Sequence, residues 1–322
     1  MAWLLKENIP WKVNKPLNPF PMLLLEFLEK KNVHTSLMEL LVELSHATEE
    51  ISTSIIQAST KKAGSINASG EEQIAMDILA NDILVRYVKT NPYVAGYCSE
   101  EINGFEKVVG EGLYSVFFDP LDGSSLFDVN FSVGTIIGIY EGIDVLGRTP
   151  RGQVAALYAV YGPRTTIMLT IGQGVHEFLF TEDGWELLNE DVRLSGTKKY
   201  FAPGNLRATQ EREDYLELVN WYMKEQYTLR YSGGMVPDIN HIFKKGSGIF
   251  IYPGMPSAPD GKLRLLYECG PMAFLMEQAG GAGSNGECSI LDVEIREYHQ
   301  RTPIFLGKKE EVARCEKALK SI

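Results

Sequence analysis

The sequence predicts a mixed α/β protein with two core-bearing halves, and three observations support this. Its 322 residues are enough for two hydrophobic cores. Apolar residues recur at helical spacing in 36–59, whereas 154–161 and 165–170 are short apolar runs typical of strands. A polar segment rich in glycine, serine and lysine at 195–199 separates the halves. We therefore predict an N-terminal subdomain over residues 1–195 and a C-terminal subdomain over 196–322.

Hydrophobic spacing predicts the elements of the first half. We expect residues 1–30 to form an extended arm, because prolines and isolated aromatic residues replace any helical pattern there. The spacing in 36–59 predicts a core-packed helix, and a second helix is expected to open at 70–77 after a loop rich in glycine, serine and asparagine. Alternating apolar and small residues in 129–140 predict a further pair of buried strands.

The second half shows the same mixture of patterns. Residues 215–227 have the spacing of an amphipathic helix, 249–253 reads as a strand, and 271–279 as a helix that ends at a pair of glycines. Helices and strands therefore alternate through both halves.

Two carboxylates mark the end of the apolar strand at 116–118. Pro120 restricts its own φ and keeps Asp119 out of the helical region, so we expect a defined turn in which Asp119 and Asp122 face one cation. Hard oxygen ligands favour Mg²⁺ or Mn²⁺. The alternative is a turn in which aspartate serves turn propensity alone.

A glycine and two hydroxyls follow these carboxylates. Gly123 allows backbone N–H groups to approach an anion closely, and Ser124 and Ser125 add hydroxyl donors. The whole run from 117 to 125 thus has the composition of a metal and phosphate site.

Carboxylates also stand at the edges of two other apolar segments. Glu100 and Glu101 follow a strand, and adjacent residues of an extended chain point opposite ways, so one can bind a metal while the other holds water or a proton. A solvated acidic loop is the alternative. Lys262 and Glu268 flank Leu-Arg-Leu-Leu-Tyr and could hold opposite ends of one ligand.

The second half contains residues suited to another anion. Asn205 and Arg207 follow a Pro-Gly turn and could meet an anion, although a structural turn explains them equally well. Segment 230–238 combines a cation, an aromatic hydroxyl and a glycine pair, a mixture that suits a sugar phosphate, and Tyr252 adds a phenol at a strand end.

Composition excludes several classes of function. The chain is 44% hydrophobic and 23% charged, as ordinary globular proteins are, and its net charge of −11 argues against nucleic acid as the main partner. Its apolar stretches are too short to span a membrane. The four cysteines have no metal spacing and are expected to be reduced thiols. We expect a cytoplasmic protein, or a plastid one if a presequence has been removed.

The ordered motifs CSEE, DPLDGSS, VGTI and GKLRLLYE resemble those of the sugar bisphosphatase family, which contains fructose-1,6- and sedoheptulose-1,7-bisphosphatases. The resemblance runs from about Leu37 to Gly307. It implies a sugar-phosphatase fold, with αβαβα layers and two mixed sheets, and an active site between the halves. It also implies a homodimer or homotetramer.

The resemblance further implies a role for each matching residue. The metal ligands would be Glu100, Asp119, Asp122, Glu268 and the Leu121 carbonyl, for two or more Mg²⁺ ions, with Mn²⁺ the alternative. The scissile phosphate would be held by Gly123, Ser124 and Ser125. The sugar and its distal phosphate would be held by Asn205, Arg207, Arg230 of a neighbouring subunit, Tyr231, Gly234, Met235, Tyr252 and Lys262.

We expect in-line attack of water on the C1 phosphate of the sugar, with Glu101, Asp77 and Glu71 placing the water and taking its proton. Family members usually have Asp at the position of Glu71, and the helix dipole alone could explain both acidic residues of this helix.

Segments such as FAPGNLRAT and YTLRYSGGMVPDIN look like the sedoheptulose branch, so a seven-carbon bisphosphate is the expected substrate. The alternatives are fructose 1,6-bisphosphate, both sugars, a more distant inositol monophosphatase-like activity, or a non-catalytic sugar-phosphate sensor.

Two departures from family patterns bear on regulation. Animal relatives bind AMP through threonines, a Lys-Tyr pair and an Arg, where this chain has Leu37 and Met38, Leu113-Tyr114, and Glu141. Because an acidic residue repels a nucleotide phosphate, we predict no AMP inhibition. Plastid relatives carry a redox cysteine pair where this chain has Thr60 and Ser65, so thioredoxin switching is not expected.

Overall fold

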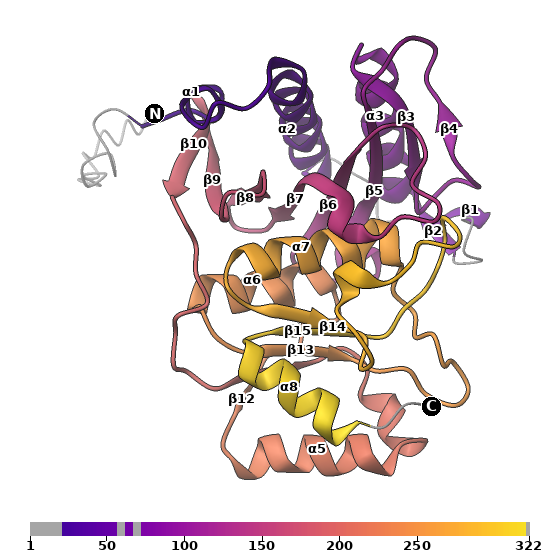
Figure 1. Cartoon of the computed structure of the whole chain (residues 1–322), viewed down its shortest axis with the longest axis vertical. Coiled ribbons are helices and arrows are strands. Elements are labelled where there is room, and N and C mark those ends of the chain that lie inside the picture. Colours follow the sequence, from indigo (N-terminus) through magenta and orange to yellow (C-terminus); the bar gives the residue numbers. More distant parts are fainter. Residues whose placement is uncertain (1–20, 57–61, 67–71, 320–322) are drawn as a thin grey trace, which may run out of the picture.

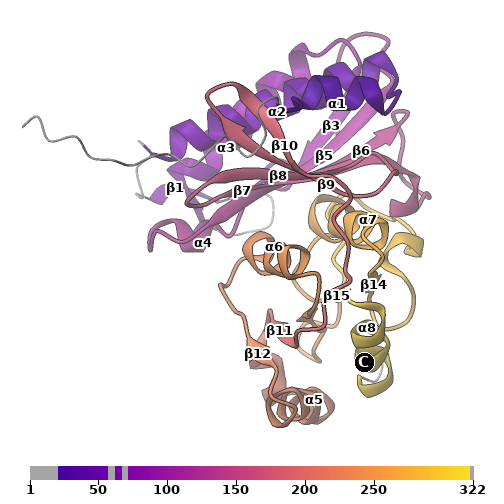
Figure 2. The same ribbon diagram turned by 90° about the vertical axis from the view of Figure 1, so that its left-hand side faces the viewer.

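The structure is a computed structural model that describes residues 21–56, 62–66 and 72–319. In these ranges the chain forms one sheet of eight strands, one of five and one of two. Figure 2 shows the elements stacked as alternating layers of helix, sheet, helix, sheet and helix. The expectation of layered α/β architecture with two mixed sheets is confirmed.

The eight-stranded sheet lies in the first half of the chain, in the order β10-β9-β8-β7-β6-β5-β3-β4. Strands β3 and β5 run parallel, and the other neighbours are antiparallel. The bounds of these strands are β3 Val94–Ser99, β4 Glu106–Lys107, β5 Tyr114–Asp122, β6 Val133–Glu141, β7 Gln153–Tyr161, β8 Thr165–Thr170, β9 His176–Thr181 and β10 Gly184–Asn189.

The five-stranded sheet lies in the second half, in the order β12-β11-β13-β15-β14. Its bounds are β11 Tyr200–Pro203, β12 Thr228–Leu229, β13 Ile249–Tyr252, β14 Ala282–Ser284 and β15 Ile304–Gly307. The two-stranded sheet pairs β1 (Lys62–Ile66) with β2 (Glu72–Ile74).

Helices form the other three layers (Figure 1). The outer layer on the large sheet contains α1 (Leu24–Lys30), α2 (Thr35–Ile55) and α3 (Ala75–Thr90). Between the sheets lie α6 (Met235–Lys245) and α7 (Gly270–Gln278), and outside the small sheet lie α5 (Glu213–Lys224) and α8 (Lys309–Ala318). A short helix, α4 (Ser124–Phe127), follows β5.

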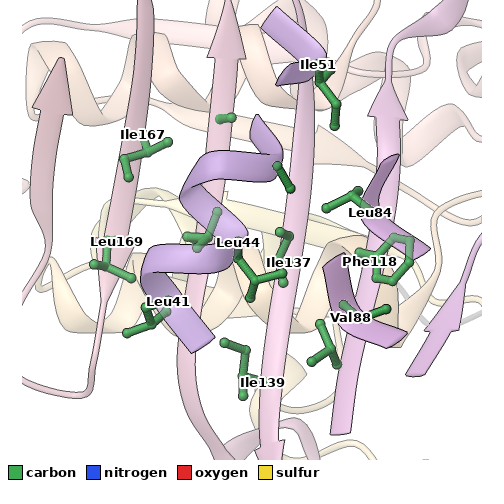
Figure 3. Close-up of a cluster of buried hydrophobic side chains, with 14 of the residues drawn as sticks. Leu41, Leu44, Ile51, Leu84, Val88, Phe118, Ile137, Ile139, Ile167 and Leu169 are labelled. Carbon is green, nitrogen blue, oxygen red and sulfur yellow. The ribbon is translucent and has the colours of Figure 1, made fainter. Parts of the chain in front are cut away.

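Strand β5 shows why the sheet must be covered on both faces. Val116 and Phe118 are buried in the core beneath α2 and α3, whereas Phe117 is buried in the core shared with α7. Alternate residues of a strand point to opposite faces, so an apolar run requires a layer of helices on each side. Figure 3 shows the first of these cores, with Leu44 of α2 and Leu84 of α3 directed at the sheet.

Three sequence expectations about boundaries need correction. The pair of buried strands expected over 129–140 is a single strand, β6, Val133–Glu141. The extended arm expected over residues 1–30 is wrong for 24–30, which form α1 with Leu24, Phe27 and Leu28 buried. This short helix gains its stability from packing, not from a long amphipathic pattern. The helix expected to open at Gly70 begins at Ala75, because residues 72–74 pair with β1.

The remaining segments of the expected arm and loop, residues 1–20, 57–61 and 67–71, lie outside the described residues, as do 320–322. The boundary between residues 195 and 196 stays a prediction. It falls in the connection between β10 and β11. None of the helices in the described ranges is both long and apolar enough to cross a membrane.

Candidate active site

The parallel pairing of β3 and β5 brings the first two carboxylates together. Ser99 lies opposite Phe118, and the Glu100 N–H donates to the Phe118 carbonyl at 3.1 Å. Parallel strands end at the same edge of a sheet, so Glu100 and Asp119 leave that edge side by side.

A bulge in β5 explains how Asp119 and Asp122 face the same cavity. The motif was expected to turn, but it continues as strand to Asp122. Asp119 lies opposite Ile136 and Asp122 opposite Gly134, so β5 contains one more residue than β6 over this stretch. Residues three apart normally point to opposite faces of a strand. The extra residue of the bulge brings Asp119 and Asp122 to the same face. Pro120 is tolerated because a bulge removes one ladder hydrogen bond.

The fourth carboxylate comes from a π turn. Residues Leu265–Cys269 form one π-helical turn before α7, and Glu268 lies buried in it. Its Oε2 accepts the Arg264 N–H at 2.6 Å. Single π turns widen the backbone locally and are frequent at functional sites.

Three of these side chains form a tight acidic cluster. Glu100, Asp119 and Glu268 each place a carboxylate oxygen so that all three oxygens lie within 4.8 Å of one another. Burial, followed by the neighbouring Glu100 charge, raises the pKa of both Asp119 and Glu268 well above the usual values. The Arg264 guanidinium lies 3.5 Å from Glu100 and supplies part of the balancing charge.

Asp122 is held differently from this cluster. Its two oxygens accept the backbone N–H groups of Met235, at 3.2 Å, and Val236, at 2.7 Å, so the side chain caps the N-terminus of α6. Burial raises the pKa of Asp122 to about 6, and these N–H groups and Lys262 act in the opposite direction. Asp122 is therefore a cap as well as a predicted metal ligand.

The phosphate-binding turn predicted at 123–125 opens α4. Gly123 has φ of +80°, a left-handed conformation that side chains other than glycine rarely adopt, and its N-cap position starts the helix at Ser124. The first N–H groups of a helix have no partner within it and point outwards, as binding of an oxyanion requires.

These segments surround a cavity of about 450 Å³. Most of the predicted site residues in the described ranges line it: Asp77, Glu100, Glu101, Asp119, Leu121, Asp122, Gly123, Ser124, Ser125, Arg207, Tyr231, Gly234, Met235, Tyr252, Lys262 and Glu268. The structure thus brings together residues from both halves, while their individual roles stay predictions.

Glu101 and Asp77 reach the cavity by local turns. Glu100 and Glu101 lie in a turn that follows β3 rather than on an extended chain, and both residues line the cavity. Asp77 also accepts the Ile74 N–H at 2.8 Å at the start of α3. Asp77 therefore caps the start of α3 and also lines the cavity.

Part of the cavity lining is basic and phenolic. Arg207, Tyr252 and Lys262 form this part together, and burial raises the pKa of the Tyr252 hydroxyl while the two cations oppose this shift. A phosphate placed there would meet two positive side chains and a phenol.

Two predicted residues in the described ranges do not line the cavity. Asn205 is buried elsewhere, with its amide 3.9 Å from the Met255 sulfur. Arg230 is exposed and donates to the Leu229 carbonyl at 2.8 Å. Glu71 lies outside the described residues.

Sequence reasoning missed two charged residues of the cavity. Arg264 is 1% exposed and carries a buried Nη2 with no hydrogen-bond partner among the described residues. Asp238 accepts the Ser232 N–H at 2.9 Å, and burial raises its pKa to about 6. A charge between the leucines of Leu-Arg-Leu-Leu was the available signal for Arg264.

The donor set fits a divalent metal ion. Three mutually repelling carboxylates, two of them buried, are stable together only when protonated or when a cation compensates them, and Arg264 supplies a single charge. Carboxylate oxygens suit hard cations.

Comparisons with known proteins agree with this geometry. Profiles of the fructose-1-6-bisphosphatase N-terminal and C-terminal domains match residues 22–190 and 194–320. The chain is 43% identical over 299 residues to the chloroplastic sedoheptulose-1,7-bisphosphatase of Spinacia oleracea, covering 91% of this chain and 77% of that one. It is also 43% identical over 304 residues to the fructose-1,6-bisphosphatase class 1 of Syntrophotalea carbinolica, covering 92% and 93%.

A solved structure is similar throughout. Leishmania major fructose-1,6-bisphosphatase superposes with a TM-score of 0.86 at 30% identity, covering 93% of this chain and 99% of that one. Both domain profiles, the two relatives and this fold lead to one conclusion: the chain belongs to the fructose-1,6-bisphosphatase family, whose members are metal-dependent phosphoric monoester hydrolases.

Proposed function

We propose that this enzyme removes the C1 phosphate of sedoheptulose 1,7-bisphosphate, yielding sedoheptulose 7-phosphate and inorganic phosphate, and that it uses Mg²⁺. Hydrolysis of a sugar bisphosphate follows from membership of the family. The choice of sugar and metal is the proposal.

The observation that carries the choice of sugar is the position of Arg207. Arg207 lines the cavity together with Tyr252 and Lys262, and its positive charge acts on the Tyr252 phenol beside that of Lys262. A second cation beside Lys262 and Tyr252 suits the distal phosphate of a longer sugar. The surrounding Phe-Ala-Pro-Gly-Asn-Leu-Arg segment is the one that resembles the sedoheptulose branch.

The roles of the chain's own groups follow from their places. Gly123, Ser124 and Ser125 would orient the scissile phosphate, and Glu101 and Asp77 would hold a water and accept its proton. Glu100, Asp119, Asp122, Glu268 and the Leu121 carbonyl would hold the metal. Divalent cations bound there would stabilise charge on the phosphoryl oxygens and lower the pKa of water.

Fructose 1,6-bisphosphate is the second candidate substrate. The relatives that bear the two names are equally similar to this chain, at 43% identity. An enzyme that accepts both sugars is consistent with this equality.

Phosphate release from each bisphosphate tests the proposal directly. The assay compares kcat/KM for both sugars with Mg²⁺, Mn²⁺ or EDTA present. We expect turnover only with a divalent cation and a higher kcat/KM for the seven-carbon sugar. Higher kcat/KM with fructose 1,6-bisphosphate would transfer the assignment to that sugar, and no release from either would reject the activity.

Arg207→Gln separates the two sugars at the level of one residue. Loss of a charge-assisted contact should raise KM for sedoheptulose 1,7-bisphosphate by roughly tenfold and affect the shorter sugar less. KM measured for both substrates checks this. Equal changes for the two sugars would mean that Arg207 does not sense sugar length.

We also propose a homodimer or homotetramer in which Arg230 reaches a neighbouring cavity. Arg230 is exposed and does not line the cavity of its own chain, which supports this. Mixing inactive Arg230→Ala with inactive Asp119→Asn should restore partial activity, because hybrid oligomers would contain a cavity with both residues intact. Failure to regain activity in verified hybrids contradicts the proposal.

A further inference from the structure

Helix α6 connects the candidate active site with a distant part of the large sheet. It begins at Met235, which lines the cavity, and ends at Lys245. Eleven residues at 1.5 Å each make it about 16 Å long. Its two ends are therefore separate places in the molecule.

One face of α6 contacts three strands in turn. Val236 packs so closely on β6 that a Cβ at Gly134 would lie 2.4 Å from it. Asn240 accepts a hydrogen bond from the Tyr158 hydroxyl of β7 at 3.2 Å. Lys244 forms an ion pair with Glu177 of β9. Positions 236, 240 and 244 are four apart and so lie in one row along the helix.

The last of these contacts, between Lys244 and Glu177, involves a buried carboxylate. The Glu177 side chain is 2% exposed, and its Oε2 accepts hydrogen bonds from both Lys244 and Asn189 of β10. Lys244 is 32% exposed, so its stem reaches down from the surface to the buried carboxylate. A buried carboxylate that lost its cation would be strongly unfavourable, which fixes this end of the helix.

The opposite end of α6 is fixed by Asp122, through the N–H groups of Met235 and Val236. A rigid helix held at both ends cannot slide or tilt at one end without moving the other. The backbone just before α6 packs closely on the site, since a Cβ added at Gly234 would lie 3.1 Å from Leu126 and 3.3 Å from Asp122.

We propose that Glu177, with Lys244 and Asn189, is a positioning group that sets where the first turn of α6 lies in the substrate cavity. This rests on the proposed function, because Tyr231, Gly234 and Met235 line the cavity and are expected from the family resemblance to contact the sugar bisphosphate. Glu177 touches neither substrate nor the acidic cluster and acts through the helix.

Charge-neutral variants test the proposal. Lys244→Gln, Glu177→Gln and the double variant are compared with Lys245→Gln, which removes a lysine charge from the same turn without touching Glu177. The readouts are KM and kcat with Mg²⁺, the Kd for the bisphosphate in EDTA by calorimetry, and amide exchange of segment 233–240.

Lys244→Gln should raise KM and Kd roughly three- to tenfold, with a smaller change in kcat, and should speed exchange at the start of α6. Glu177→Gln should do less, because it leaves no buried charge, and the double variant should be no worse than Lys244→Gln. Lys245→Gln should resemble the wild type.

Two results overturn the proposal. One is a lowered melting temperature with unchanged KM and Kd, which marks a purely structural pair. The other is an equal effect of Lys245→Gln. A wild-type protein that binds the bisphosphate but does not hydrolyse it would reject the proposed function alone, since Kd and exchange still report on Glu177.

Discussion

Asp119 and Asp122 have the same chemistry but different surroundings. Asp119 is crowded by the Glu100 and Glu268 carboxylates, and its Oδ1 accepts the Leu121 N–H at 3.0 Å. Asp122 is surrounded by donors and caps α6. Replacement of each residue should therefore affect stability in a different way.

Asp119→Asn should lower kcat by at least about a hundredfold while the melting temperature of the metal-free protein stays within about 2 °C of wild type. The amide keeps an acceptor for Leu121 and removes one repelling charge. Asp122→Asn should also lose activity, and it should cost about 1–2 kcal/mol of unfolding free energy, because the amide NH₂ faces a helix N–H.

Phosphate release and urea denaturation in EDTA measure the two effects. Asn240→Ala, which removes a hydrogen bond elsewhere on α6, is the control for stability. Near-normal turnover in either variant contradicts the assignment of these carboxylates, and equal losses of stability contradict the capping role of Asp122.

The residues of the site were largely predictable from sequence, but their geometry was not. Carboxylates, glycine and hydroxyls at strand ends indicated a metal and phosphate site. The bulge between Asp119 and Asp122 depends on how β5 pairs with β6, and no local pattern encodes that pairing. Arg264 was missed because a charged residue between two leucines is typical of a strand whose charged side chain points to solvent.

At the level of elements, Gly134 determines how closely α6 approaches the large sheet. It lies opposite Asp122 in the strand register, and a Cβ there would lie 2.4 Å from Val236 and 2.5 Å from the Ala159 carbonyl. The capping of α6 by Asp122 therefore depends on the absence of a side chain at Gly134.

Gly134→Ala should cost about 1–3 kcal/mol of unfolding free energy and lower activity, because α6 must move away from the sheet. Denaturant titration and kcat/KM measure both effects. Adding Val236→Ala should recover only a small part of the loss, because it removes the Val236 Cγ1 contact at 2.4 Å but leaves the Val236 Cβ at 2.7 Å and the Ala159 carbonyl at 2.5 Å. A Gly134→Ala variant with wild-type stability would show that α6 is not packed as described.

The start of α2 is a second element, and it bears on the prediction that AMP does not inhibit the enzyme. Tyr114 is hydrogen bonded through its hydroxyl to Ser36 at 2.9 Å, and Leu37 is buried in the core. These side chains belong to the segments that in animal relatives would bind AMP. Here the Tyr114 and Ser36 hydroxyls are bonded to each other, and Leu37 packs in the core.

AMP titrated up to millimolar concentration should therefore leave the rate of phosphate release unchanged. ADP and inorganic phosphate serve as controls for non-specific inhibition at the cavity. Inhibition at micromolar AMP contradicts the prediction. The prediction that thioredoxin does not switch this protein rests partly on Thr60. Thr60 lies outside the described residues, so this absence of switching stays a prediction.

Long elements were predictable and short ones were not. The helix predicted over 36–59 is α2, Thr35–Ile55, because many turns repeat the same spacing. Helix α1 and strand β2 are too short for a recognisable period, and they form only because the rest of the fold covers or pairs them.

At the scale of the whole molecule, one buried and two half-buried histidines make stability depend on pH. Burial lowers the pKa of His176, His241 and His299 below 6.5. The folded protein keeps these rings neutral, while the unfolded chain binds protons at higher pH. These histidines therefore lower the unfolding free energy as pH falls through 6.5, and they have no such effect at higher pH.

Unfolding free energy, measured in urea from about pH 8 to about pH 5.5, should fall less steeply in His176→Gln than in the wild type. The comparison isolates one ring from the buried carboxylates, which titrate in both proteins. Parallel curves for the two proteins would show that His176 does not resist protonation.

The layered architecture could be predicted only in part. Periodicity indicated helices and strands, whereas the order of layers came from the family resemblance, because sheet order depends on pairings between distant segments. The oligomer, the metal and the sugar stay proposals.

The origin of the acidic cluster in the chain has a consequence for biosynthesis. Glu100 and Asp119 come from adjacent strands made early, but Glu268 belongs to a turn synthesised much later. A ribosome-bound first half would present an incomplete set of ligands. Capture of a cation is thus expected to be a late event of maturation, after both halves have left the ribosome and docked.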